Sequence, residues 1–213
     1  MSAAIYESLH LVEVAVRNAM DGALRTWNAE QRNTRGLPHS PLWTISPSIQ
    51  IAKRSKGWFS EAEIRAKKSL KAKGVLNPVP QHDDIVANLT FGYWVSLLPV
   101  ALYKEKSPLT RLWNDGLSAA FPHQTRRPSI IVDHLVDLRY VRNRVAHLEP
   151  FELQKIEWIA ARIDYVLESV SPDVAAWHRR SSRLLEVSDR HPSASCRHDY
   201  VVNSSWCKKC MAD

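Results

Sequence analysis

The chain has 213 residues, 45% of them hydrophobic, and a formal net charge of +7. This composition is typical of one folded domain with a sizeable core and excludes a wholly disordered protein. It contains no apolar run long enough to span a membrane. The positive charge favours a polyanionic partner such as RNA, although a basic surface without any specific partner would have the same charge.

The first predicted element is one long amphipathic helix. Its apolar residues recur every three or four positions, at Ile5, Leu9, Val12, Val16, Ala19, Ala23 and Trp27. Charged residues interrupt this segment, which argues against a secretory signal, so we expect a cytoplasmic protein. Residues 28–41 hold Gly36 and two prolines and predict a loop. The stretch 43–58 is compatible with a loop or a short helix.

A lysine-rich helix is predicted next. Ser60 and Glu63 have the spacing of a capping box, which predicts a helix from Ser60 to Lys73 with Gly74 as its stop. Residues 53–73 contain eight Lys or Arg against two Glu. The helix has few large apolar residues, so we expect it on the surface, where it can contact an RNA backbone. The candidate RNA-binding residues are Lys67, Lys68, Lys71 and Lys73.

Two aromatic residues, Trp58 and Phe59, precede this predicted helix. They could stack on RNA bases. They could equally belong to the hydrophobic core, with the lysines forming an ordinary solvated face. We favour the core interpretation for the two rings and keep the lysines as an electrostatic attraction for RNA.

The rest of the chain continues the helical pattern. Asp83 or Asp84 can cap a helix whose apolar positions extend to Leu98, and Ser107-Pro108 opens another that reaches Phe121. Further helices are predicted over 128–149, over the heptad-like stretch 153–170, and in one short segment after Pro172. The sequence therefore predicts an all-α helical bundle over residues 1–190 and a distinct tail over 191–213.

The helix that begins at Pro128 carries the candidate catalytic residues. Arg139, Asn143 and His147 are spaced four apart and share one stripe, and Arg142 lies about 100° away, nearer the core-facing side. A guanidinium can bind a phosphate, and an imidazole can move a proton near neutral pH. Polar residues at a helix end can also serve only to complement the helix dipole.

Several blocks of the sequence resemble the Abi-like (abortive infection) branch of the HEPN superfamily. Residues 142–150 read Arg-Asn-x-x-Ala-His-x-Glu-Pro, close to the signature of that family. Glu13, Arg17 and Asn18 are similar to the Glu-x-x-x-Arg-Asn run of its first helix, and residues 89–94 resemble its Leu-x-Phe-Gly-x-Trp helix. Residues 175–177 and 182–183 look like its C-terminal helix, so the resemblance covers roughly residues 5–192.

This resemblance implies a homodimeric, metal-independent endoribonuclease of a toxin type, linked to phage defence. His147 would act as general base or acid, and Arg142 would stabilise charge on the phosphate. Asn143 would orient His147 or the phosphate. Glu149, Glu13, Arg17, Asn18 and Arg139 would support them, although Glu13 and Arg17 could also form a simple surface ion pair. An antitoxin or another regulatory partner would restrain the activity.

One departure from the family pattern bears on this mechanism. Many relatives carry a second His after the first, whereas this chain has Leu148. Acid and base would therefore come from both subunits. The alternative function is a non-catalytic HEPN module for dimerisation or RNA binding. A transcription regulator is a weaker alternative, since no helix-turn-helix pattern is evident.

The tail contains all three cysteines of the chain. Cys196 and His198 are followed by Cys207 and Cys210, which together could hold a structural zinc, with His191 as another ligand. Free thiols in a reducing cytosol are the alternative. The family resemblance does not reach this tail, and no cofactor is expected for catalysis.

Overall fold

The computed structural model describes residues 2–99, 107–147, 149 and 155–190. Within these residues the chain is helical and forms no β-strand, apart from an isolated bridge between Arg32 and Pro38. The expected all-α fold is confirmed. The candidate zinc ligands of the tail lie outside the described residues. No helix in the described ranges combines the length and the hydrophobicity of a membrane span.

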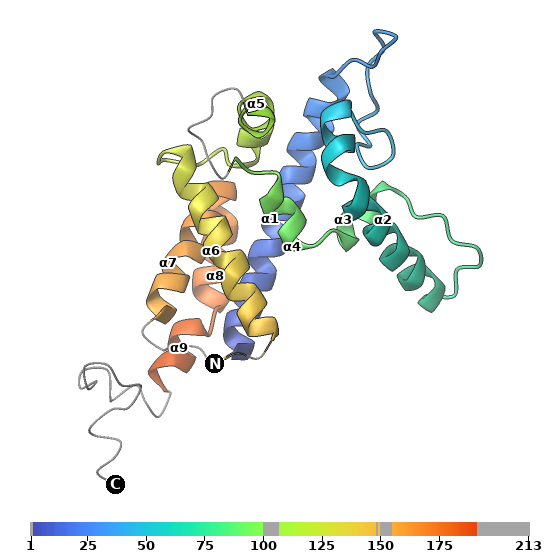
Figure 1. The fold of residues 1–213 in the computed structure, drawn as a ribbon. Coiled ribbons are helices and arrows are strands. Elements are labelled where there is room, and N and C mark those ends of the chain that lie inside the picture. The colour runs from blue at the N-terminus through green and yellow to red at the C-terminus, as the bar shows by residue number, and fades with distance from the viewer. Residues whose placement is uncertain (1, 100–106, 148, 150–154, 191–213) are drawn as a thin grey trace.

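Helix α1 (Ser2–Glu30) is the central element of the fold. The predicted apolar stripe is buried at Ile5, Leu9, Val12, Val16 and Trp27. One side of α1 packs against α6 (Pro128–Ala146) and α7 (Ile156–Val170), whereas α2 and α3 lie on the other side (Figure 1). Burying such a stripe against several elements removes apolar surface from water and stabilises the bundle by about 25 cal/mol per Å².

The C-terminal segment forms two helices where we expected one. Helix α8 (Pro172–Ser181) packs against α7, and α9 (Leu184–Asp189) contacts both α7 and α1. The helical path breaks at Ser182, whose φ and ψ of −72° and 131° are extended. The break lets Leu184 turn back into the core, where it is 2% exposed.

Helix α2 (Ile49–Ala72) corrects the prediction of a helix that starts at Ser60. It begins after Ser48 and continues through Ser60 without interruption, so the capping box at Ser60 is not used. The reason is tertiary: Ser55 is buried, and its hydroxyl lies 2.8 Å from the hydroxyl of Tyr93. The predicted stop is confirmed, because Gly74 has a φ of +84°.

The helix expected up to Leu98 is two short helices, α3 (His82–Asn88) and α4 (Phe91–Ser96). Neither Asp83 nor Asp84 is the N-cap: that residue is Gln81, and Asp84 accepts a hydrogen bond from its backbone N–H at 2.9 Å. The extended C-cap Leu89 ends α3, and Thr90 caps α4 by accepting from the N–H of Tyr93. This break places residues 90–92 close to α6.

The helix expected from Ser107 to Phe121 is also interrupted. It consists of α5 (Pro108–Asp115) and the 3₁₀ helix η1 (Leu117–Ala120), with Gly116 between them. A Cβ on Gly116 would lie 2.7 Å from the Trp27 ring. The backbone therefore approaches α1 at a distance that only glycine permits.

Candidate functional site

A cleft of about 320 Å³ lies beside the candidate catalytic helix. Helix α6 contributes Arg139, Arg142 and Asn143, and α2 contributes Trp58. The opposite wall is the start of α4, formed by Thr90, Phe91 and Gly92. The sequence pattern identified the α6 residues, whereas the wall opposite them depends on the break between α3 and α4.

Arg142 is the most constrained polar residue of this cleft. Its side chain is 32% exposed, and its Nε atom is buried without a hydrogen-bond partner. The nearest carboxylate oxygen is Oε2 of Glu13 on α1, at 3.7 Å from Nε, which is within ion-pair reach but beyond a hydrogen bond. Because Nε is buried, an anionic ligand in the cleft would be bound by the exposed part of the guanidinium.

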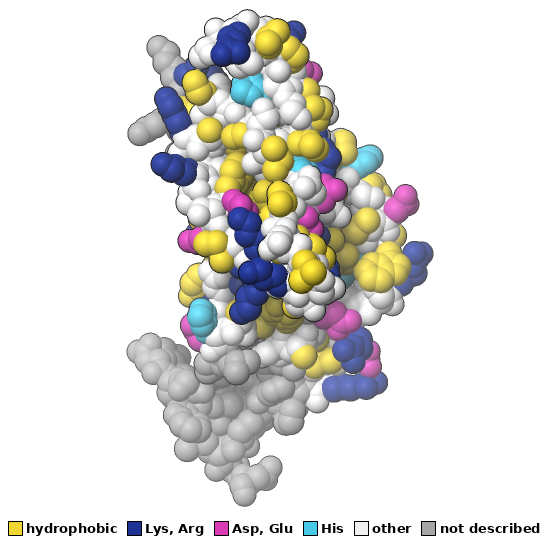
Figure 2. Space-filling view, turned by 90° about the vertical axis from the view of Figure 1, so that its right-hand side faces the viewer, with side chains coloured by type: hydrophobic (Ala, Val, Ile, Leu, Met, Phe, Trp, Pro, Cys, Tyr) yellow, Lys and Arg dark blue, Asp and Glu magenta, His cyan; other side chains and the backbone are white. Residues whose placement is uncertain are grey.

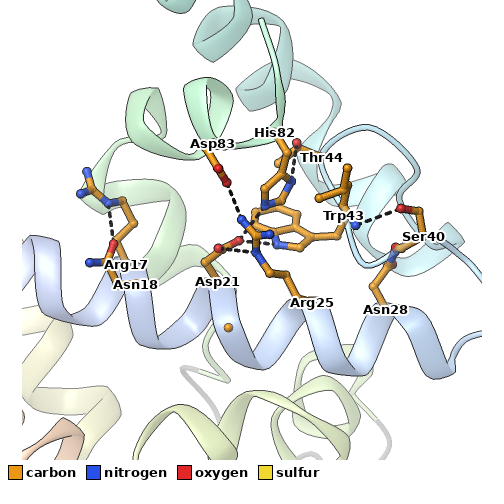
Figure 3. Close-up of polar contacts among 12 residues, drawn as sticks. Arg17, Asn18, Asp21, Arg25, Asn28, Ser40, Trp43, Thr44, His82 and Asp83 are labelled. Atoms are coloured by element: carbon orange, nitrogen blue, oxygen red, sulfur yellow. Dashed lines mark hydrogen bonds and ion pairs between the residues drawn. The ribbon is translucent and has the colours of Figure 1, made fainter.

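The structure distinguishes Glu13 from the other two candidates on α1. Glu13 faces Arg142 across the helices and does not form an ion pair with Arg17. Arg17 instead donates from its Nε atom to Asn18 at 3.3 Å (Figure 3). Neither Arg17 nor Asn18 lines the cleft.

His147 occupies the C-cap position of α6 and is exposed. Its backbone N–H bonds to the carbonyl of Asn143, which holds the last turn together. The imidazole does not line the cleft within one protomer. Glu149 accepts a hydrogen bond from Nε of Arg144 at 2.8 Å, so it pairs with Arg144 and with neither Arg142 nor His147.

The lysine-rich face of α2 is exposed as expected. Lys67 forms an ion pair with Glu63 at 2.7 Å, while Lys68, Lys71 and Lys73 project from the surface. Figure 2 shows the side of the molecule on which α2 lies in Figure 1, and Lys and Arg side chains gather there in groups. These lysines do not line the cleft, to which α2 contributes only Trp58.

The two aromatic residues of α2 have different environments. Phe59 packs against Trp43 and Tyr93, with ring centroids 5.7 and 6.0 Å apart, as expected of a core residue. Both rings are half-buried, but Trp58 lines the cleft in addition to packing against Tyr93.

A polar cluster that sequence reasoning missed joins α1 to α3 (Figure 3). The Asp21 carboxylate accepts hydrogen bonds from Nε1 of Trp43 at 2.8 Å and from Nε of Arg25 at 2.8 Å, and it lies 3.0 Å from Nε2 of His82. Nδ1 of His82 lies 2.9 Å from the hydroxyl of Thr44. Only the i, i+4 spacing of Asp21 and Arg25 could have been seen in the sequence.

Geometry and burial give this cluster a structural role. His82 is 3% exposed and both of its ring nitrogens have partners, so it is not available to a substrate. Burial opposes ionisation of Asp21, but hydrogen bonds from His82, Arg25 and Trp43 outweigh it and hold the pKa of Asp21 below its ordinary value. The cluster fastens α3 and the loop before α2 to α1.

A second and larger cleft, of about 490 Å³, lies between α7, α8 and α9. Its most buried polar residue is His178, whose Nε2 lies 3.0 Å from the hydroxyl of Ser8. Desolvation by burial lowers the pKa of His178. The apolar part of its lining comes from Ala160, Ala161, Leu184 and Leu185, and the polar part includes the ion-paired Asp164 and Arg179.

The described residues contain no group of three or more His, Cys, Asp or Glu side chains arranged to hold a metal ion. Comparisons of the chain with protein-family models, with curated proteins and with solved structures found no match. The cleft and the residues that form it are therefore the features that point to a function.

Proposed function

We propose that this protein is an endoribonuclease of the Abi-like HEPN type, acting on RNA without a metal ion. The observation that carries the proposal is the Arg142 guanidinium, which is partly exposed, lines a cleft and lies within ion-pair reach of Glu13. Arg139 and Asn143 line the same cleft, so a phosphate would meet two guanidinium groups and an amide. Positioned donors of this kind stabilise the charge that develops during phosphoryl transfer.

The proposed reaction begins with attack of an RNA 2′-hydroxyl on the adjacent phosphorus. The 2′-oxygen–phosphorus bond forms, the bond to the 5′-oxygen of the next nucleotide breaks, and a 2′,3′-cyclic phosphate remains. His147 accepts the proton of the 2′-hydroxyl, and a second imidazole donates a proton to the leaving 5′-oxygen. Arg142 stabilises the phosphoryl oxygens, and Glu13 limits the positions that its guanidinium can adopt.

The second imidazole is proposed to be His147 of the partner subunit. His147 is exposed and lies one helical turn beyond Asn143, outside the cleft of its own protomer. Leu148 replaces the second His of many relatives, so one protomer offers a single imidazole at this end of α6. A homodimer that brings two α6 ends together would supply both the acid and the base.

The test is cleavage of total cellular RNA in excess EDTA by the wild type, His147→Ala and Arg142→Ala. We expect fragments with cyclic phosphate ends from the wild type alone. Arg180→Ala is the matched control, because Arg180 is exposed on α8 and remote from the cleft lining. Equal cleavage by the wild type and His147→Ala would contradict the assignment of His147.

The alternative is a non-catalytic module that dimerises or binds RNA. The observation that favours it is the position of His147 outside the cleft that Arg142 lines. RNA binding that needs Arg142, together with no cleavage by the wild type, would support this alternative.

A further inference from the structure

Trp58 gives the cleft a feature that phosphate binding does not need. The ring lines the cleft together with Arg139 and Arg142, and its other contacts are with the core, where it packs against Tyr93 at a centroid distance of 5.9 Å. Tyr93 is itself fully buried and bonded to Ser55, so the platform beneath Trp58 is fixed. A ring that is already immobilised loses little conformational entropy when a ligand packs on it.

The start of α4 comes close to the edge of this ring. A Cβ on Gly92 would lie 3.7 Å from Cη2 of Trp58 and 3.6 Å from Oγ1 of Thr90, both ordinary contact distances. A methyl group at Gly92 would therefore touch the ring edge. A longer side chain would extend into the part of the cleft nearest the ring, because Gly92 lines that cleft.

The charges complement a nucleotide. In the described structure the side chains of Arg139 and Asn143 make no hydrogen bond or ion pair, and the guanidinium of Arg142 is partly exposed beside them. An anionic group is therefore favoured at the α6 side of the cleft, and a flat aromatic group is favoured at the Trp58 side. The volume of about 320 Å³ is at the low end of the range for small-ligand sites.

We propose that the cleft is a subsite for one unpaired nucleotide, whose base stacks on Trp58 while its phosphate binds Arg139 and Arg142. The subsite selects single-stranded RNA, because a base inside a duplex cannot leave its stack without the cost of unpairing. That the bound polymer is RNA rests on the proposed function. The inference adds that the bound RNA is single-stranded and that Trp58 contacts its base.

The test measures binding of labelled single-stranded oligonucleotides by fluorescence anisotropy. The probes are 2′-deoxy strands, which lack the attacking hydroxyl and cannot be cleaved by the proposed reaction. One probe carries all its bases and a second has one abasic position. We expect the wild type to bind the complete strand more tightly, by roughly 5- to 100-fold for the stacked base.

Three variants test whether the preference for the complete strand over the abasic strand depends on the cleft. Trp58→Leu removes the aromatic face and should abolish the preference, and Trp58→Phe should retain part of it. Gly92→Leu keeps the aromatic ring but extends a side chain into the part of the cleft beside it, and should abolish the preference. The control is Trp177→Leu on α8, since Trp177 is 55% exposed and does not line the cleft.

The outcomes separate this inference from the nuclease proposal. Equal binding of the two probes by the wild type would overturn the subsite, even if the protein cleaves RNA. A preference that survives in both Trp58→Leu and Gly92→Leu would do the same. A preference that depends on these residues in a protein that cleaves no RNA would keep the subsite and refute the nuclease.

Discussion

At the scale of single residues, partial burial changes the solvation and the hydrogen bonding of the Arg142 guanidinium. Its ion pair with Glu13 leaves Nε without a hydrogen bond, so the guanidinium is neither freely solvated nor fully satisfied inside the protein. Arg and Lys are not interchangeable in such a place, because the guanidinium offers a planar set of donors and the ammonium a point charge.

The first prediction concerns this difference. Arg142→Lys should lower the rate of RNA cleavage by on the order of 100-fold, since it removes the paired donors while keeping the charge. The measurement is kcat/KM on a short RNA substrate, with Arg180→Lys as the matched control. Full activity in Arg142→Lys would show that a positive charge at this position is enough for cleavage. It would contradict a requirement for the planar donors of the guanidinium.

The second prediction concerns Asp21, whose carboxylate is only 13% exposed and holds three elements together. Asp21→Asn should lower the free energy of unfolding by about 3 kcal/mol, because it breaks the pairing of a largely buried charge. Thermal denaturation measures the loss. Asp173→Asn on the exposed surface of α8 is the control and should change the unfolding temperature little.

At the scale of elements, several boundaries depend on contacts between distant residues. Helix α2 runs through Ser60 because Ser55, Trp58 and Phe59 pack on Tyr93. The break at Thr90 lets α4 reach α6 and form the wall of the cleft. Local capping signals predicted other boundaries, since the sequence around Ser60 contains no information about Tyr93.

The third prediction tests the close contact between η1 and α1. Gly116→Ala should cost about 1–3 kcal/mol of stability, because its Cβ would overlap the buried Trp27 ring at 2.7 Å. The matched control is Gly57→Ala in α2, where a Cβ meets no atom within 4 Å. That change should stabilise the protein by up to about 1 kcal/mol through helix propensity. Chemical denaturation curves of both variants would show whether the two effects have opposite signs.

At the scale of the whole molecule, buried titratable groups make stability depend on pH. Desolvation by burial lowers the pKa of His178, and burial together with nearby Arg162 lowers the pKa of His134. Both imidazoles are therefore easier to protonate in the unfolded chain. The pKa of Asp21 is also lowered in the folded state, so folded Asp21 keeps its charge to a lower pH than the unfolded chain does.

The fourth prediction follows from these directions. In each case the unfolded state binds more protons, so the free energy of unfolding falls as pH falls. The first decrease begins as pH falls below the ordinary His value of 6.5, and the second begins below the ordinary Asp value of 3.8. Denaturation curves between pH 3 and pH 8 measure both steps. His178→Gln should reduce the first step, and an unchanged step in that variant would rule out His178 as a source.

The helical class, the core face of α6 and the order of the main helices could all be predicted from the amino-acid sequence. These properties follow from a periodic apolar pattern, which is a local signal that repeats over many residues. On α6, Ile131, Leu135, Leu138, Val141 and Val145 recur every three or four positions, and all five are buried. The candidate residues Arg139, Arg142 and Asn143 were likewise identified from their spacing, and the structure brings them to one cleft.

What faces those residues depends on how distant segments pack together. The pairing of Glu13 with Arg142, the placement of Trp58 in the cleft and the approach of Gly92 to the Trp58 ring each join segments that are far apart in the chain. The cluster of Asp21, Trp43 and His82 was invisible for the same reason. Single polar residues carry no periodic signal, so their partners become known only when packing brings the helices together.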